Sequence, residues 1–329
     1  MTVRGSRALW AGALSVVLPV TAALAQTAAS YPNRPITLVV PYTPGSGIDV
    51  LARVIAPKLN RAWGEPVVVD NKPGASGIIG ADAVAKAAPN GYTLMVTVNS
   101  FTMAPALYAN MPYDPVADFT PIAKIALASY AFAVDPAALP VRDFSEFVAV
   151  VKAKPSALNY GSPGNGTSYH LAMELMKLHL GLQIVHVPYK GLAGAMTDLL
   201  SGRVQMMFAT VHALLPSQKA GKLKFLAVTG PARSPLAPDV PTFRERGFDF
   251  MDDIDAWYAV MGPARLPRDI VAKLNAELGA IMIMADVREQ LTNQGLVPVT
   301  STPEELAALI KADLPRWAKV VAGAKISAD

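Results

Sequence analysis

Short continuous apolar runs alternate with helix-length amphipathic segments along most of this chain. The runs at 36–42, 66–70 and 92–98 are rich in β-branched residues and lack polar alternation, which is typical of strands buried on both faces. Between them, residues 49–63 carry apolar side chains at helical spacing, and a second helix is expected over about 73–88. This strand–helix rhythm predicts a parallel sheet covered by helices.

The same rhythm begins again near residue 130. The expected strands and helices of this second unit cover residues 130–134, 144–152, 158–160, 168–180, 184–187, 191–201, 204–208 and 224–229. After a proline-rich stretch, a strand and two helices are expected at 256–261, 268–284 and 302–319. The pattern therefore predicts two α/β lobes, which we draw as lobe 1 (26–124 plus 229–329) and lobe 2 (125–228).

The N-terminus has the pattern of a secretory signal peptide over residues 1–25. Arg4 and Arg7 precede an uncharged apolar run, and Ala23-Leu-Ala25 has the small side chains of a signal peptidase site. The run is short for a membrane helix, so a retained single-span anchor is the less favoured alternative. We therefore expect cleavage after Ala25 and a mature protein in the periplasm.

Composition excludes several classes of function. The chain has no cysteine, which excludes disulfides, thiolate catalysis and cysteine-ligated metals. The formal net charge of +4 becomes +2 (4 − 2) once Arg4 and Arg7 leave with the signal peptide, and no basic cluster indicates nucleic-acid binding. The 4 histidines lack the spacing of a metal site, so we expect neither a metal nor a cofactor.

A glycine-rich loop stands between the first expected strand and the first expected helix. Gly45 and Gly47 allow a close approach of backbone to ligand, and the start of the helix offers N–H groups and its positive dipole end to an anion. The hydroxyl groups of this loop belong to Tyr42, Thr43 and Ser46. A plain connecting turn is the alternative. A dinucleotide site is disfavoured, because Val50 replaces the third glycine and Asp49 would repel a pyrophosphate.

A second loop of the same kind precedes the helix expected at 168–180. Its residues that we expect near a ligand are Ser162, Gly164, Gly166, Thr167 and Ser168. One such loop in each lobe suggests that the two loops face each other and bind one anion between them. On the following helix, His170 lies four residues before Glu174. A metal or acid–base pair is possible there, but a simple pair on the helix surface is favoured.

Several longer motifs resemble those of one family, in the same order along the chain. They are Tyr31-Pro-Asn-Arg-Pro-Ile36, Val40-Pro-Tyr-Thr-Pro-Gly45 with Asp49, Val69-Asp-Asn-Lys-Pro-Gly-Ala75, Ala88-Pro-Asn-Gly-Tyr-Thr-Leu94, Tyr113-Asp-Pro-Val116, Asn159-Tyr-Gly-Ser162 and His186-Val-Pro-Tyr-Lys-Gly191. The chain resembles the Bug proteins, the substrate-binding components of tripartite tricarboxylate transporters. The resemblance implies an α/β, type II periplasmic-binding-protein fold of two lobes with a ligand cleft between them.

The resemblance also implies a function and a set of ligand contacts. The expected ligand is a small organic anion, a di- or tricarboxylate or an aromatic acid, which a monomeric, non-enzymatic protein delivers to inner-membrane transporter subunits. The ligand-binding residues carried over from the family are Tyr42, Gly45, Ser46, Gly47, Asp49, Ser100, Ser162, Gly164, Gly166, Thr167, Ser168, His170, Tyr189 and Ala209.

Two departures from the family pattern bear on the ligand. The usual Pro-Gly-Gly is Pro44-Gly-Ser46 here, and the Asp-Asn that usually follows the strand at 204–208 is Ala209-Thr210. The missing acid favours a ligand without an amino group. The alternative functions are a ligand sensor for signalling and an exported hydrolase that uses Ser162 and His170, although no nucleophile motif surrounds that serine.

Overall fold

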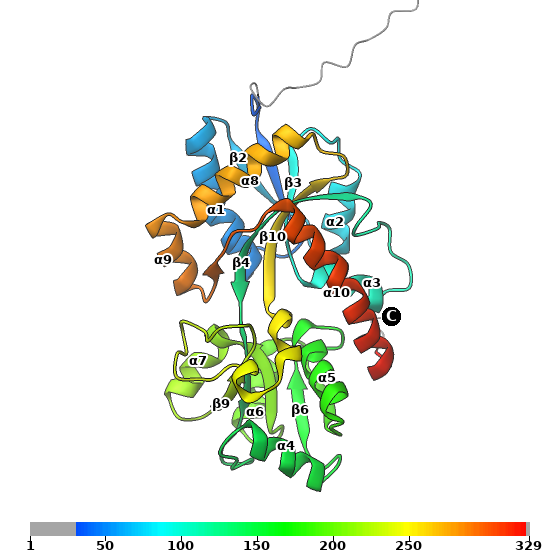
Figure 1. Cartoon of the computed structure of the whole chain (residues 1–329), viewed down its shortest axis with the longest axis vertical. Helices are drawn as coiled ribbons and strands as arrows, with labels where there is room; N and C mark the ends of the chain where they lie inside the picture. Colours follow the sequence, from blue (N-terminus) through cyan, green and yellow to red (C-terminus); the bar gives the residue numbers. More distant parts are fainter. Residues whose placement is uncertain (1–30, 327–329) are drawn as a thin grey trace, which may run out of the picture.

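The computed structural model describes residues 31–326, which form two α/β lobes stacked along the long axis of the molecule (Figure 1). The predicted signal peptide at residues 1–25 lies outside the described residues. The first lobe contains β1 (Ile36–Val40), β2 (Val67–Asn71), β3 (Thr93–Val98), β4 (Phe119–Ala128), β10 (Ala256–Pro263) and β11 (Val297–Pro298). The second lobe contains β5 (Tyr130–Val134), β6 (Asn159–Ser162), β7 (Val185–Pro188), β8 (Met206–Thr210) and β9 (Lys224–Val228).

The two sheets repeat one strand order. The first sheet runs β2-β1-β3-β10-β4-β11 and the second runs β7-β6-β8-β5-β9. β1 pairs in parallel with β2 and β3, and β6 pairs in parallel with β7 and β8, which confirms the predicted parallel pairing. In each sheet, the strand that arrives from the other lobe, β10 or β5, is inserted antiparallel to its two neighbours. Each lobe is therefore completed by a strand whose chain has just left the other lobe.

Helices cover both faces of each sheet. On the first sheet, α1 (Gly47–Trp63), α8 (Arg268–Met282) and α9 (Ala285–Asn293) share one face, and α2 (Ile78–Ala85), α3 (Ser100–Leu107) and α10 (Pro303–Ala324) share the other. On the second sheet, α4 (Phe144–Ala153) and α5 (Ser168–Leu180) lie opposite α6 (Leu192–Leu200) and α7 (Val211–Lys219). Within residues 31–326, no helix combines the length and apolarity needed to cross a membrane.

Most predicted elements lie within a few residues of the observed ones, and the predicted bounds of α5 match those observed. The sequence did not predict β4, α3, α7, α9 or β11. All of these except α9 contain a proline, such as Pro105 in α3, and a proline argues against a strand or helix when only local sequence is considered. The longer helices α1 and α10 were predicted although they contain Pro57 and Pro315, because their apolar periodicity extends over more turns. Packing in the folded protein outweighs that local cost.

The C-terminal helix α10 bridges the two lobes. It begins with a capping box, in which Thr302 and Glu305 exchange hydrogen bonds between side chain and backbone at 2.9 and 3.1 Å. Leu306 and Ile310 pack in the core of the first lobe, whereas Trp317 belongs to the core that also contains residues of α5. Figure 1 shows the red helix running from the first lobe to a position beside α5. One helix therefore contacts both lobes.

The chain crosses between the sheets at Ser129, the single residue between β4 and β5, and again over residues 229–255. The buried carboxylate of Asp255, which immediately precedes β10, joins these crossings. It accepts hydrogen bonds from Ser129 Oγ at 3.1 Å and from the hydroxyl of Thr229. The Thr229 hydroxyl also accepts from Tyr130 N at 2.8 Å. The segments that link the lobes are thus bonded to one another as well as to their own sheets.

The second crossing contains two short 3₁₀ helices, η3 (Arg244–Arg246) and η4 (Asp249–Ile254). Before them, Phe243 packs against Phe132 and Phe144 of the second lobe, with 4.9 Å between the ring centroids of Phe243 and Phe144. We therefore propose that the second lobe covers residues 129–254, rather than the 125–228 expected from sequence.

Replacing Asp255 by asparagine tests the role of this carboxylate. Burial raises the pKa of Asp255 from 3.8 to about 6, so the folded protein holds this proton more tightly than the unfolded chain does. This contribution to stability is complete below pH 4 and is lost as the pH rises through 6. Between pH 4.5 and pH 7.5 the wild type should therefore lose this contribution, whereas Asp255→Asn does not titrate and should not. The variant should thus gain roughly 2–3 kcal/mol of unfolding free energy relative to the wild type over this range.

Urea unfolding at the two pH values measures this difference. Asp249→Asn, an exposed position in the same crossing segment, is the matched control and should show no such gain. A gain for Asp255→Asn that did not change with pH would contradict the assignment.

Candidate functional site

A cavity of about 300 Å³ lies between the two lobes. Its walls come from α3 and the cavity ends of β3 and β10 in the first lobe, and from the second glycine-rich loop, the start of α5 and the ends of β5 and β8 in the second. The lining residues are all uncharged. The volume is at the lower end of the range for small-molecule sites, so the cavity suits a compact ligand.

Four tyrosines line this cavity, and three of them are hydrogen-bonded within the protein. The hydroxyl of Tyr42 pairs with Ser100 Oγ, and both residues line the cavity as the sequence predicted. The hydroxyl of Tyr130 accepts from Asn99 Nδ2 at 3.1 Å. Tyr169 packs edge-on against Tyr130, with 5.1 Å between the ring centroids. These contacts give the cavity an aromatic wall whose orientation is set from both lobes.

The second glycine-rich loop lines the cavity through Gly166, Thr167 and Ser168. Thr167 caps α5, because its hydroxyl accepts from His170 N at 3.4 Å. The N–H groups of Gly166 and Thr167 are bonded to His170 Nδ1 and Gly164 O, at 3.0 and 3.4 Å. The N–H groups of Ser168 and Tyr169, in the first turn of α5, have no acceptor within the helix, which suits them to an anion.

The first glycine-rich loop lies beside the cavity, and of its predicted contacts only Tyr42 is in the lining. Gly47 comes close, since a Cβ built on it would lie 3.7 Å from the Tyr258 hydroxyl. The hydroxyl of Ser46 is used within the loop, where it donates to Thr43 O at 2.8 Å. This loop therefore approaches the cavity chiefly through its backbone.

Asp49 is 2% exposed and stabilises the conformation of the first loop without lining the cavity. Its carboxylate accepts hydrogen bonds from Gly45 N at 2.8 Å, Arg53 Nε at 2.9 Å and Asn71 Nδ2 at 2.9 Å. Desolvation opposes ionisation, but the hydrogen bonds from Arg53, Gly45 and Asn71 prevail and hold the pKa of Asp49 below its ordinary value. The anionic side chain is thus neutralised within the protein and does not face the cavity.

Ser162, Gly164 and His170 lie behind the second loop and are not in the cavity lining. Ser162 is fully buried, and its hydroxyl pairs with His186 Nε2 at 2.6 Å rather than with His170. The rings of His170 and His186 stack with 3.9 Å between centroids. The pair of Ser162 and His170 that a hydrolase was expected to use is therefore not formed.

The predicted surface pair of His170 and Glu174 is wrong, because both side chains are buried. Glu174 accepts hydrogen bonds from Tyr160 OH and Lys177 Nζ, each at 2.5 Å. Helical spacing put the two residues on one face, but that face points into the lobe. Burial first, and then the charge of Lys177, lowers the pKa of His170 to about 4.

Two other predicted contacts occupy supporting positions. Tyr189 N donates to Ser162 O at 2.9 Å and its hydroxyl donates to Asp198 Oδ2 at 2.7 Å, so this residue braces the second loop. Ala209 is fully buried in the core of the second lobe, and its neighbour Thr210 lines the cavity instead. Because strand side chains alternate between faces, a shift of one residue moves a contact from the core to the cavity.

The lining residues that the sequence did not indicate include Met103, Leu107, Tyr130, Tyr169, Thr210 and Tyr258. Met103 and Leu107 belong to α3, which was itself not predicted. Leu107 meets the second loop, since a Cβ on Gly166 would lie 3.0 Å from Leu107 Cδ1. Side chains alternate between the two faces of the sheet along β10, so Tyr258 and Trp257 lie on opposite faces. This alternation in the sequence does not reveal which of the two faces meets the cleft.

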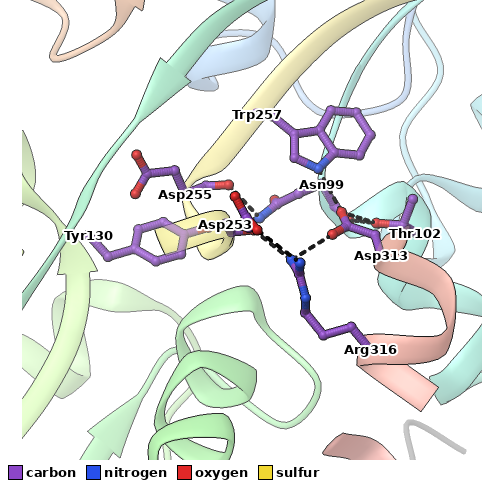
Figure 2. A network of polar contacts seen from close by, with 8 residues as sticks. All are labelled: Asn99, Thr102, Tyr130, Asp253, Asp255, Trp257, Asp313 and Arg316. Atoms are coloured by element: carbon purple, nitrogen blue, oxygen red, sulfur yellow. Dashed lines mark hydrogen bonds and ion pairs between the residues drawn. The ribbon is translucent and has the colours of Figure 1, made fainter. Parts of the chain in front are cut away.

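A polar network connects the cavity to α10 (Figure 2). Asn99, which lines the cavity, accepts through its backbone oxygen from Thr102 Oγ1 at 2.9 Å. The same hydroxyl lies 3.1 Å from the buried carboxylate of Asp313, which also accepts from Trp257 Nε1 at 2.8 Å and from Arg316 at 3.0 Å. In residues 31–326, no group of three or more His, Cys, Asp or Glu side chains is arranged to hold a metal ion.

Comparisons with known proteins agree with this architecture. The sequence model of the "Tripartite tricarboxylate transporter family receptor" matches residues 51–326. BugT of Bordetella pertussis is 36% identical over 305 residues, which cover 91% of this chain and 93% of BugT. A solved protein of R. palustris with adipate is 35% identical, with a TM-score of 0.74 and coverage of 90% and 99%. The periplasmic binding protein BugD is 32% identical, with a TM-score of 0.71 and the same coverage. The expected two-lobed periplasmic-binding fold is confirmed.

Removing the carboxylate of Asp49 should destabilise the protein. Asp49→Ala leaves Gly45 N–H and one N–H of the Asn71 amide without an acceptor, and we expect a loss of roughly 2–3 kcal/mol in unfolding free energy. Urea denaturation measures the loss. The control is Asp70→Ala, since the Asp70 carboxylate is 41% exposed and pairs with Lys72 at the surface. Equal losses in the two variants would show that Asp49 has no special role.

The buried state of His170 predicts a loss of stability in acid. Because its pKa is about 4 in the folded protein and 6.5 ordinarily, the unfolded chain binds the proton first, and stability falls as the pH drops below 6.5. His170→Asn keeps an acceptor for Gly166 N–H without titrating. The wild type should therefore lose roughly 2–3 kcal/mol more than this variant between pH 7.5 and pH 4.5.

Chemical denaturation at both pH values gives the comparison, with the exposed His179→Asn as control. Parallel pH profiles for the wild type and His170→Asn would contradict the prediction.

Proposed function

This chain belongs to the tripartite tricarboxylate transporter receptor family, and from that premise we propose that it captures a small organic carboxylate between its lobes for a transporter of this type. The observation that carries the proposal is the uncharged cavity between the lobes, which meets the start of α5. The adipate held by the R. palustris relative supports a carboxylate as the ligand.

The cavity binds an anion with neutral groups. Backbone N–H groups at the start of α5 and a hydroxyl such as that of Ser168 offer charge-assisted hydrogen bonds of roughly 1.5–3 kcal/mol each. Four to six of them, after the cost of association, give about −8 kcal/mol, which is near micromolar affinity. Without a lysine or arginine in the lining, the ligand can leave again when the lobes separate.

We assign the predicted contacts to two roles. The ligand contacts are Tyr42, Ser100, Gly166, Thr167 and Ser168, with Gly47 beside them. The residues that hold the two loops in shape are Gly45, Ser46, Asp49, Ser162, Gly164, His170 and Tyr189. This division follows the cavity lining, because the five contacts are part of it, whereas the residues of the second group lie outside it and bond within the protein.

Export and partners belong to the same proposal. The protein is exported with cleavage after Ala25, acts in the periplasm as a monomer and delivers its ligand to inner-membrane transporter subunits. The periplasmic relative BugD supports this location. A hydrolase is disfavoured, because Ser162 is fully buried and outside the lining, where its hydroxyl could not reach a bound ester.

A thermal-shift panel tests the proposed ligand class. Adipate, benzoate, malate and citrate are compared with the matched neutral amides. A carboxylate present at 100 times its Kd stabilises the folded protein by about 2.7 kcal/mol, which should raise the Tm by roughly 5 °C. The amides should raise it less, because they lack the charge that the helix start favours. Equal shifts by acids and amides, or no shift by any acid, would contradict carboxylate binding.

A further inference from the structure

One tyrosine hydroxyl in the cavity lining has no hydrogen-bond partner among residues 31–326. Tyr258, on β10, is only 9% exposed, yet no described residue bonds to its phenol oxygen. The hydroxyls of the other three lining tyrosines are bonded to Ser100, Asn99 and Thr210. Because Tyr258 lines the cavity and its hydroxyl bonds to no described residue, the hydroxyl is available to donate to an acceptor that enters the cavity.

The phenol of Tyr258 can only act as a donor to an anion. Burial raises its pKa above the ordinary value, with smaller contributions from Tyr169 and Tyr42, so the hydroxyl keeps its proton. It lies beside Gly47, at the first turn of α1, where backbone N–H groups also favour negative charge. A carboxylate oxygen at this point would meet the hydroxyl and a helix start together.

A different chemistry lines the cavity along α3. Met103, Ala104 and Leu107 present apolar side chains, and Val98 and Pro163 continue the same kind of surface. The hydroxyl or extra carboxylate of a ligand placed there would lose its water without gaining a partner. An apolar ligand body would instead bury its surface, at roughly 25 cal/mol per Å².

We propose, on the basis of the proposed function, that Tyr258 donates its hydroxyl to the ligand carboxylate while the α3 wall receives an apolar ligand body. The cavity thereby selects aliphatic or aromatic carboxylates over hydroxylated di- and tricarboxylates. Tyr258 is then a specificity-determining contact, and it lies on the strand that returns the chain from the second lobe to the first.

The role of the hydroxyl is tested with Tyr258→Phe, which removes one oxygen atom and keeps the ring. Isothermal titration of the wild type and the variant with adipate and benzoate should give a Kd that is roughly 10- to 100-fold weaker in the variant. The Tm of the ligand-free variant should match that of the wild type, because the hydroxyl has no partner within residues 31–326. Tyr113→Phe, at a buried tyrosine outside the lining, is the control and should bind normally.

The role of the α3 wall is tested with the wild type alone. Adipate and benzoate should bind at least about tenfold tighter than malate and citrate, because a ligand hydroxyl or extra carboxylate buried against this wall loses its water without gaining a partner. Tighter binding of malate or citrate would overturn the inference and leave carboxylate binding intact. A Kd within twofold of the wild type in Tyr258→Phe would overturn the assignment of Tyr258. If no acid binds the wild type, the proposed function itself fails.

Discussion

The hydrogen bonds at the two crossings between the lobes determine how the walls of the cavity meet. Asp255 accepts from Ser129 and Thr229, so the end of the second crossing is bonded to its own start and to the single residue of the first. The strands that follow these crossings, β5 and β10, each lie between two other strands of their sheet. The cavity lies next to this junction, as Tyr130 and Ala256 directly adjoin it and also line the site.

The charged side chains near the two glycine-rich loops do not line the ligand cavity. Asp49 and Glu174 are ionisable, buried and close to the two glycine-rich loops, yet each is bonded to a cation and to neutral donors of the protein. Asp49 holds the first loop in shape and Glu174 is paired inside the second lobe, while the cavity receives only uncharged groups. This separation avoids the desolvation cost of a buried ion pair with the ligand and suits a receptor that must release what it binds.

Much of the fold could be predicted from local patterns. The strand–loop–helix units around Gly45 and Gly166 were evident, because apolar periodicity, helix caps and glycines act over a few residues. The short helix α3, with its internal Pro105, could not be predicted this way, since contacts with distant segments stabilise it. Sequence reasoning found the cavity residues on the loops and Ser100 at the start of α3, but missed Met103 and Leu107 further along α3 and Tyr258 on β10.

The sequence by itself determined the two α/β units, the two glycine-rich loops and the class of protein, because these depend on local periodicity and on motifs that follow one another along the chain. The tertiary structure decided which side chains face the ligand. Asp49 and His170 turned inward, Thr210 took the place expected for Ala209, and Tyr258 entered from a strand far along the chain. Periodicity shows that a strand or helix has two faces, and only packing against distant segments decides which face meets the cavity.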